Sequence, residues 1–350
     1  MRYSRSARAT SFGLQSGAHY TETGGYGWAT AMPSPTLGGL PPLVNAPHDA
    51  GRYNRAMLTS ASSHTTEKPK ARNVRIGLVQ QRWHADPARH AQAMRRGVLA
   101  AAARGAQLIC LQELTLHRYF ADAKDPARFS LAEPLSGGPT SALCSKLAGE
   151  SGAFVIGSLF ECSAGRYFNT AVIFDPRGNL FGFTRKQHIP RGSGYHEDYY
   201  FEPGDSDYPV HDLGFVKLAV PTCYDQWFPE LARICTLKGA ELIVYPTAIG
   251  SEPDFPDFDT QPRWQAMMVA HAIANGVFVA AVNRTGDEGT VRFYGSSFVC
   301  DPTGRVIARA PRNRPAVLVA DLDFGVMAFW RDLFPLLQQR QPHTYQMLTA

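Results

Sequence analysis

Hydrophobic and polar positions follow a regular succession from residue 74 onward. Residues 74–80 (VRIGLVQ) alternate between the two kinds and then become continuously apolar, which predicts a buried β-strand. Pro87 opens a helical stretch that continues to Arg104, and Gly105 follows at a position where helices commonly end. Residues 106–111 (AQLICL) then predict a second buried strand. This succession of strand, helix and strand is typical of an α/β fold.

The succession returns in the second part of the chain. Residues 215–222 predict a strand, Pro229 opens a helix and Gly239 ends it. Three pairs of segments also match in the same order: AQLICL at 106–111 with AELIVY at 240–245, GAFV at 152–155 with GVFV at 276–279, and DPRG at 175–178 with DPTG at 301–304. The last pair has the composition of hairpin turns. We therefore expect two similar halves within one α/β domain, with two sheets packed face to face and helices outside.

Residues 1–72 have a different composition, with 30 Gly, Pro, Ser or Thr residues and no sustained apolar period. Such a segment cannot bury enough apolar surface to offset the entropy of ordering it. We therefore expect a disordered N-terminal extension, either a targeting segment or the result of an early start before Met57, and a folded domain over residues 73–350. The extension also accounts for the formal net charge of +5. The balanced body gives no electrostatic reason to expect a nucleic acid as a partner.

The six cysteines lie far apart and form no CxxC pair, which excludes a zinc ribbon or a thioredoxin-type motif. Such unpaired usage favours a reducing compartment, and we expect a cytoplasmic protein. The longest apolar stretch, residues 267–282, is interrupted by His271, Asn275 and Gly276, so no membrane span is expected. The histidines offer no set of ligands, and neither a metal nor a cofactor is predicted.

Cys223 is the residue whose position is most typical of a nucleophile. It follows an apolar strand and precedes a segment that turns into the helix at Pro229. Partial positive charge at a helix N-terminus favours thiolate over thiol, and the N–H of Tyr224 can point at a developing oxyanion. Position alone leaves a buried structural cysteine as the alternative.

Two charged residues follow strands in the first half of the chain. Glu113 comes after the strand that ends at Leu111, where the second half has Thr247, and a carboxylate there is costly unless it is paired or used. Lys186 comes just after the strand that follows the first DPxG turn. Taken singly, each is more often an ordinary charge at a strand end.

These residues stand in longer segments that resemble the nitrilase superfamily. The segments are KQHIP at 186–190, CYDQWFPE at 223–230 and YPTAIG at 245–250, and with them the chain is most similar to the N-carbamoylputrescine amidase branch over residues 74–345. The resemblance implies an αββα four-layer sandwich with two pseudo-symmetric halves. It also implies a homo-oligomer that needs no cofactor.

The resemblance implies a role for each site residue. Cys223 is the nucleophile, Glu113 is the general base, and Glu197 positions the site. Lys186 and the N–H of Tyr224 form the oxyanion hole. The implied reaction is thiol-dependent hydrolysis of an amide or ureido carbon–nitrogen bond, with N-carbamoylputrescine and water giving putrescine, ammonia and carbon dioxide.

Four residues are candidates for binding the distal end of that substrate. Glu252, Asp254 and Asp257 follow the strand at 245–250, and their charge would attract the ammonium group of a carbamoylated diamine. Trp227 would line its methylene chain. The alternative for the three acidic residues is a solvated loop.

Other functions stay open from the sequence. Arg263 and Arg284 are available for the carboxylate of a carbamoyl amino acid, as a β-ureidopropionase or an N-carbamoyl-amino-acid amidohydrolase requires, and an ω-amidase is a further alternative. In a different class, an inactive nitrilase-like scaffold that acts only by oligomerising predicts a broken Glu–Lys–Cys set. All three residues are present, which favours an enzyme that acts on a small molecule rather than on a nucleic acid or a membrane.

Overall fold

Two six-stranded sheets form the centre of the structure, a computed structural model that describes residues 72–349. The first sheet has the strand order β14 (Ala316–Asp323), β1 (Asn73–Gln80), β2 (Leu108–Leu111), β3 (Phe154–Ser163), β4 (Arg166–Phe174) and β5 (Leu180–Arg185). The second has the order β13 (Val306–Arg309), β12 (Phe298–Cys300), β9 (Phe278–Asn283), β8 (Leu242–Thr247), β7 (Lys217–Ala219) and β6 (Val210–Asp212). A separate hairpin pairs β10 (Thr285–Asp287) with β11 (Arg292–Tyr294). Of the predicted disordered extension, residues 1–71 lie outside the described residues.

The helices of the described chain are α1 (Pro87–Ala102), α2 (Pro139–Ser151), α3 (Pro229–Leu237), α4 (Gln261–Asn275) and α5 (Phe324–Leu333). Short 3₁₀ helices occupy 120–122, 126–131, 197–199, 223–227, 342–344 and 346–349. The start of α1 follows the prediction, because Pro87 is its first residue and the Asp86 carboxylate accepts a hydrogen bond from the N–H of Ala88 at 2.9 Å. Within residues 72–349, no helix combines the length and the apolar character that crossing a membrane requires.

The two sheets correspond strand for strand, which confirms the prediction of two similar halves. In the first sheet β1, β2 and β3 run parallel, β4 and β5 follow antiparallel, and β14 lies antiparallel beside β1. In the second sheet β7, β8 and β9 run parallel, β12 and β13 follow antiparallel, and β6 lies antiparallel beside β7. The predicted turns join β4 to β5 and β12 to β13. In these turns the carboxylates of Asp175 and Asp301 accept hydrogen bonds from backbone N–H groups.

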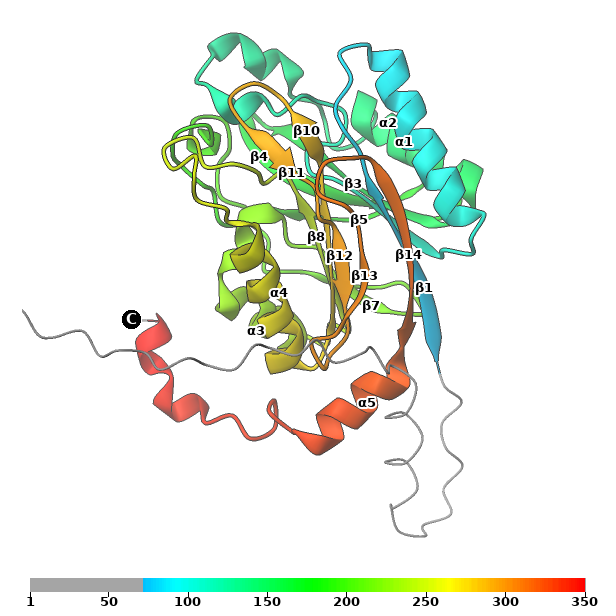
Figure 1. The fold of residues 1–350 in the computed structure, drawn as a ribbon, viewed down its shortest axis with the longest axis vertical. Coiled ribbons are helices and arrows are strands. Elements are labelled where there is room, and N and C mark those ends of the chain that lie inside the picture. The colour runs from blue at the N-terminus through cyan, green and yellow to red at the C-terminus, as the bar shows by residue number, and fades with distance from the viewer. Residues whose placement is uncertain (1–71, 350) are drawn as a thin grey trace, which may run out of the picture. The chain divides into compact units, whose positions relative to one another are not determined.

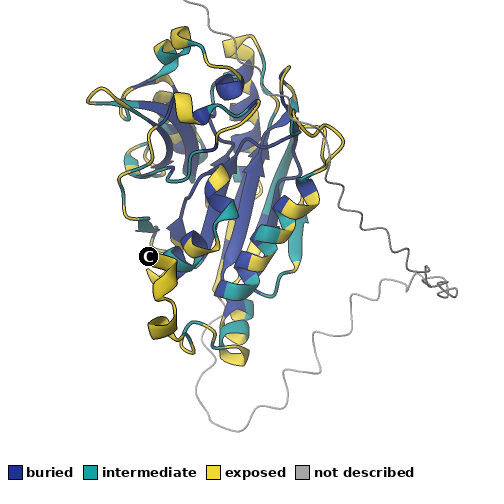
Figure 2. Cartoon of the chain, turned by 90° about the vertical axis from the view of Figure 1, so that its left-hand side faces the viewer, coloured by how far each residue is buried: buried dark blue, intermediate teal, exposed yellow. Residues whose placement is uncertain are grey.

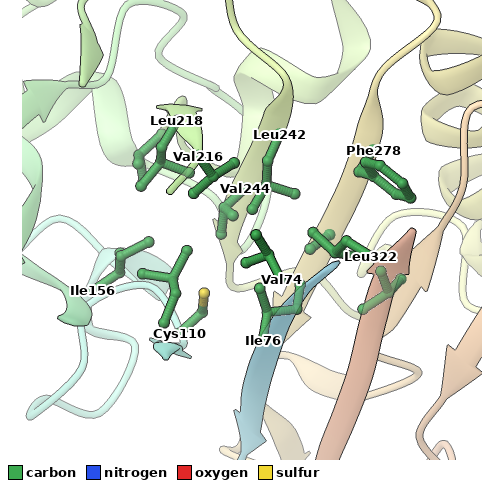
Figure 3. Packing of buried hydrophobic residues seen from close by; sticks show 14 of the residues in the cluster. Val74, Ile76, Cys110, Ile156, Val216, Leu218, Leu242, Val244, Phe278 and Leu322 are labelled. Carbon is green, nitrogen blue, oxygen red and sulfur yellow. The ribbon is translucent and has the colours of Figure 1, made fainter. Parts of the chain in front are cut away.

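An apolar core fills the space between the two sheets. Val74 and Ile76 of β1 and Cys110 of β2 meet Leu242 and Val244 of β8 there, as Figure 3 shows. Alternate residues of the central strands β1, β2, β8 and β9 point into this core, which is the arrangement expected for two sheets packed face to face.

The helices cover the outer faces of both sheets. Met94 and Val98 of α1, with Leu147 of α2, pack on the first sheet, while Leu231 of α3 and Trp264 of α4 pack on the second. Figure 1 shows the two helix pairs on opposite sides of the sheets, and Figure 2 shows buried strands between helices whose outer faces are exposed. The αββα sandwich implied by the resemblance is therefore confirmed.

Strand β7 is shorter than the sequence predicts. The expected strand covers residues 215–222, whereas pairing ends at Ala219. Pro221 has no N–H to give to a ladder, so the chain leaves the sheet before that residue. The consequence is that Thr222 and Cys223 stand beyond the sheet edge, on a turn.

The C-terminal segment carries apolar side chains on its surface. Helix α5 is attached to the end of α4, because Trp330 and Arg331 donate side-chain hydrogen bonds to the carbonyls of Ile273 and Gly276, at 3.0 and 2.7 Å. Its other side is exposed, as is the chain that follows, drawn in red in Figure 1. We call the exposed apolar side chains of this segment the C-terminal apolar surface; its members are Phe329, Leu333, Phe334, Met347 and Leu348.

Candidate active site

Cys223 lies on a strained turn between β7 and α3. Its φ is +45°, a left-handed value that a residue with a side chain seldom adopts, and it opens the 3₁₀ helix at 223–227. The carboxylate of Asp225 accepts a hydrogen bond from the N–H of Thr222 at 2.9 Å, and two from the N–H and Nδ1 of His188 at 2.9 and 2.8 Å. Asp225 is buried, so one carboxylate fastens the cysteine turn to the segment that follows Lys186.

Lys186 is the centre of a buried ionic cluster. Its Nζ donates to Glu113 Oε1 at 2.9 Å and to Glu197 Oε2 at 2.6 Å, and none of the three side chains has more than 1% of its surface exposed. Tyr119 donates its hydroxyl to Glu197 Oε1 at 2.9 Å, and Asn169 donates Nδ2 to Glu113 Oε1 at 2.7 Å. Sequence reasoning missed Tyr119 and Asn169, which lie in a loop and in a strand with no motif to mark them.

The charges of this cluster act on the thiol. Burial raises the pKa of Cys223 well above its ordinary value, and the charge of Glu113 adds to the effect while that of Lys186 opposes it. The thiol is therefore protonated at neutral pH and needs a base to become a nucleophile. Burial by itself would lower the pKa of Lys186, but Glu113 and Glu197 raise it, so the ammonium group stays charged. Burial also raises the pKa of Glu197, with Lys186 opposing the change.

Two N–H donors and one carboxylate oxygen of the site have no partner among residues 72–349. Lys186 uses two of its three ammonium N–H bonds on carboxylates, which leaves the third. Tyr224 is the second residue of its 3₁₀ helix, so its N–H has no acceptor within that helix. The Oε2 atom of Glu113 is buried without a hydrogen bond. These groups can serve an oxyanion and a moving proton, respectively.

Arg284 holds the backbone of the Glu113 segment in place. Its guanidinium is fully buried and donates to the carbonyls of Glu113, Leu114 and His117 at 2.9, 3.0 and 3.1 Å. The same group forms an ion pair with Glu288 at 3.0 Å. Its contacts with the chain leave it no role as the receptor of a substrate carboxylate, which the sequence had left open.

A cavity of about 280 Å³ opens from Cys223, a size near the lower end of the range for small-molecule sites. Buried Glu197 and Cys223 line it at depth, half-buried Trp227 and Glu252 come next, and exposed Asp254 lies at its mouth. With Tyr224, which also lines it, six of the predicted site residues surround this one space. Burial raises the pKa of the Glu252 carboxyl, so an arriving cation would stabilise its charged form.

Asp257 does not line this cavity. It is exposed and borders a different hollow of about 580 Å³, together with Phe258 and Arg312. Arg263 does not line this cavity either, and its guanidinium lies 4.7 Å from the centre of the Phe258 ring. Neighbouring positions in an irregular loop point in different directions, which is why three acidic residues close in sequence divide between two spaces. In the described part of the chain, no group of three or more His, Cys, Asp or Glu side chains could hold a metal ion.

Known proteins resemble this chain over nearly all of its described residues. The family model for carbon-nitrogen hydrolases matches residues 75–332. A citrullinase from Francisella tularensis is 38% identical over 277 residues, or 78% of this chain and 97% of that protein. An N-carbamoylputrescine amidase from Arabidopsis thaliana is 39% identical over 287 residues, or 80% of this chain and 96% of that protein. The crystal structure of a carbon-nitrogen hydrolase from Helicobacter pylori G27 matches with a TM-score of 0.74 and 32% identity, over 79% of this chain and 99% of that one.

The fold and these matches define a hydrolase of the nitrilase superfamily. The chain belongs to the carbon-nitrogen hydrolase family, and it is an enzyme that hydrolyses a carbon–nitrogen bond of a small molecule.

Replacing Arg284 with Lys should reduce kcat for ammonia release by about tenfold to a hundredfold, because the single nitrogen of a lysine cannot reach three carbonyls and Glu288 at once as the guanidinium does, and Glu113 would shift by a fraction of an ångström. KM should change much less, since Arg284 does not line the cavity. Steady-state kinetics and thermal unfolding, with Arg263→Lys as the exposed control, measure both effects. A lowered melting temperature with unchanged kcat would contradict the positioning role.

Proposed function

We propose that this enzyme hydrolyses the terminal carbamoyl group of a ureido compound through a covalent intermediate on Cys223, with N-carbamoylputrescine as the leading substrate. The observation that supports this most directly is the buried set of Glu113, Lys186, Glu197 and Cys223, which opens on a cavity with an acidic side. The two relatives described above are named for N-carbamoylputrescine and for citrulline, and both compounds carry a carbamoyl group on a terminal nitrogen.

The first step is the attack of sulfur on the carbamoyl carbon. A ureido carbonyl is a weak electrophile, so it needs a strong nucleophile and a site that stabilises the oxyanion. Glu113 takes the proton of Cys223 through its free Oε2 atom as the S–C bond forms. The oxyanion accepts hydrogen bonds from the third N–H of Lys186 and from the N–H of Tyr224, and one such donor is typically worth about 2.7–4 kcal/mol.

The second step breaks the carbon–nitrogen bond. The proton held by Glu113 passes to the leaving nitrogen, and the rest of the carbamoyl group stays on Cys223 as a thioester-type intermediate. A water molecule then gives a proton to Glu113 and attacks the same carbon, and the proton returns to sulfur as the C–S bond breaks. The carbamic acid that leaves decomposes, so the final products are the amine, ammonia and carbon dioxide. Tyr119 and Asn169 hold the two carboxylates in place throughout.

The distal end of the substrate lies toward the mouth of the cavity. Half-buried Glu252 and exposed Asp254 there favour an ammonium group, and the ring of Trp227 can cover the methylene chain that leads to it. An inactive scaffold would have no reason to keep a fully buried Lys186 between two carboxylates, because a buried charge of this kind costs stability unless it has a use.

The purified enzyme should release ammonia from N-carbamoylputrescine faster than from N-carbamoyl-β-alanine, an N-carbamoyl-D-amino acid or a simple ω-amide. Cys223→Ala should lower that rate by about a thousandfold or more, because no other group can form the intermediate. Cys235→Ala, which changes a buried cysteine of α3 outside the cavity, is the matched control. Near-normal turnover by Cys223→Ala would show that Cys223 is not the nucleophile. Hydrolysis of ω-amides alone would show that the substrate is not a carbamoyl compound.

We also propose that a second copy of this chain covers the C-terminal apolar surface. Its side chains are among the most exposed large apolar residues of the described chain, with Met347 at 84% and Leu348 at 67% of their surface open. Exposed apolar side chains gathered in one segment are typical of a protein–protein contact. The resemblance to the nitrilase superfamily also implies a second copy of the chain as the partner.

The double substitution Leu333→Asp and Phe334→Asp should lower the molar mass measured by light scattering toward that of a single chain, because two charges would have to be buried in the contact. Phe181→Asp, which changes a comparably exposed aromatic residue on β5, should leave the mass of the assembly unchanged. A wild-type protein that is already monomeric would contradict the proposal.

The proposed location is the cytoplasm. All six cysteines are free, and four of them are buried away from the cavity, which is usage that suits a reducing compartment.

A further inference from the structure

One cation at the cavity has no part in the reaction described above. Arg191 lines the same space as Cys223 and Glu252, and its side chain is exposed. Within residues 72–349 it forms no ion pair and no side-chain hydrogen bond, not even with Glu252. The carbamoyl end of the substrate is neutral, and Lys186 already serves the oxyanion that forms there. The positive charge of Arg191 is therefore free for another part of the ligand.

The loops that carry the basic and the acidic sides of the cavity, residues 190–195 and 250–255, are fastened to each other. The Tyr195 hydroxyl donates a hydrogen bond to the carbonyl of Ser251 at 3.1 Å and accepts one from the N–H of Gly250 at 3.1 Å. At Gly194 the two loops approach so closely that a Cβ atom would stand 2.7 Å from a proline ring of the second loop. The loop with the positive side of the cavity and the loop with the negative side therefore hold each other in place.

The two charged residues suit two different groups of a ligand. The planar guanidinium of Arg191 offers paired N–H donors, which match the two oxygens of a carboxylate. The half-buried carboxylate of Glu252 suits an ammonium group, because a positive partner offsets the loss of its water. A ligand end that carries both groups would use both residues, whereas a simple diamine would leave Arg191 unused and close to its own positive charge.

We propose that Arg191 lets the enzyme also accept an ω-ureido-α-amino acid, in which Arg191 binds the carboxylate and Glu252 the ammonium group at the end opposite the reacting carbamoyl. This proposal rests on the proposed function, since it takes the carbamoyl chemistry at Cys223 as given. It adds a second charge to the substrate and makes Arg191 the residue that distinguishes an amino acid from a diamine.

Four ureido compounds with similar chains separate the two charges. L-citrulline carries both an ammonium and a carboxylate, N-carbamoylputrescine only the ammonium, 5-ureidopentanoate only the carboxylate, and N-butylurea neither. Each compound is tested by ammonia release with the full chain, and every kcat/KM is divided by the value that the same variant gives for N-butylurea. This ratio cancels any general loss of folded or active enzyme.

For the wild-type enzyme we expect L-citrulline, like N-carbamoylputrescine, to give a ratio well above that of N-butylurea. Arg191→Gln should lower the ratios for L-citrulline and 5-ureidopentanoate by about tenfold, mainly through KM, and should not lower that for N-carbamoylputrescine. Glu252→Gln should lower the ratios for the two ammonium compounds in the same way. Arg263→Gln and Asp257→Asn are the matched controls, because neither residue lines the cavity.

Unchanged ratios for both carboxylate compounds in Arg191→Gln would overturn the proposal, and so would a wild-type ratio for L-citrulline no higher than that for N-butylurea. Either result would leave carbamoyl hydrolysis intact. Failure of the proposed function itself has a different signature, since none of the four compounds would then release ammonia.

Discussion

Lys186 carries its positive charge in a place without access to water, and the two carboxylates that it binds, Glu113 and Glu197, make that state stable. Removing one partner from a buried pair of this kind typically costs about 3–5 kcal/mol, because an uncompensated charge is left behind. Two carboxylates against one ammonium also leave an excess of negative charge. Together with burial, that excess keeps the Cys223 thiol protonated until a substrate arrives. The cluster is therefore both the electrostatic support of the site and the reason why the resting enzyme holds a thiol rather than a thiolate.

The surrounding chain is arranged so that this cluster and the cysteine turn keep one geometry. Arg284 donates hydrogen bonds to the carbonyls around Glu113, and Asp225 accepts hydrogen bonds that link the Cys223 turn to the segment after Lys186. Both fixing groups are buried and bound to the protein itself, and neither lines the cavity, so neither has freedom to bind a substrate. Positive φ at Leu114 and at Cys223 marks the two places where the backbone bends sharply to present a reacting group. In both cases a buried charged side chain, Arg284 or Asp225, holds the backbone beside the bend through hydrogen bonds.

The regular part of this arrangement could be predicted from the sequence, and the irregular part could not. Strand and helix periods, Pro and Gly at helix ends and three repeated segments were enough for two sheets in two halves, because each signal is local. The Glu–Lys–Cys set was found through its motifs. By contrast, nothing local distinguishes Asp254, which lines the cavity, from Asp257, which does not. Nothing in the sequence around Arg284 indicates that its guanidinium donates hydrogen bonds to carbonyls about 170 positions earlier in the chain. Such contacts exist only once both halves are folded together.

The repeated halves contribute unlike groups to the site. Glu113 and Lys186 follow strands of the first sheet, while Cys223 follows a strand of the second. The proposed base and the proposed nucleophile therefore follow strands of different sheets, and the layer of aliphatic side chains between the two sheets sets how far apart they stand. The core that stabilises the fold therefore also determines the distance over which the proposed proton transfer takes place.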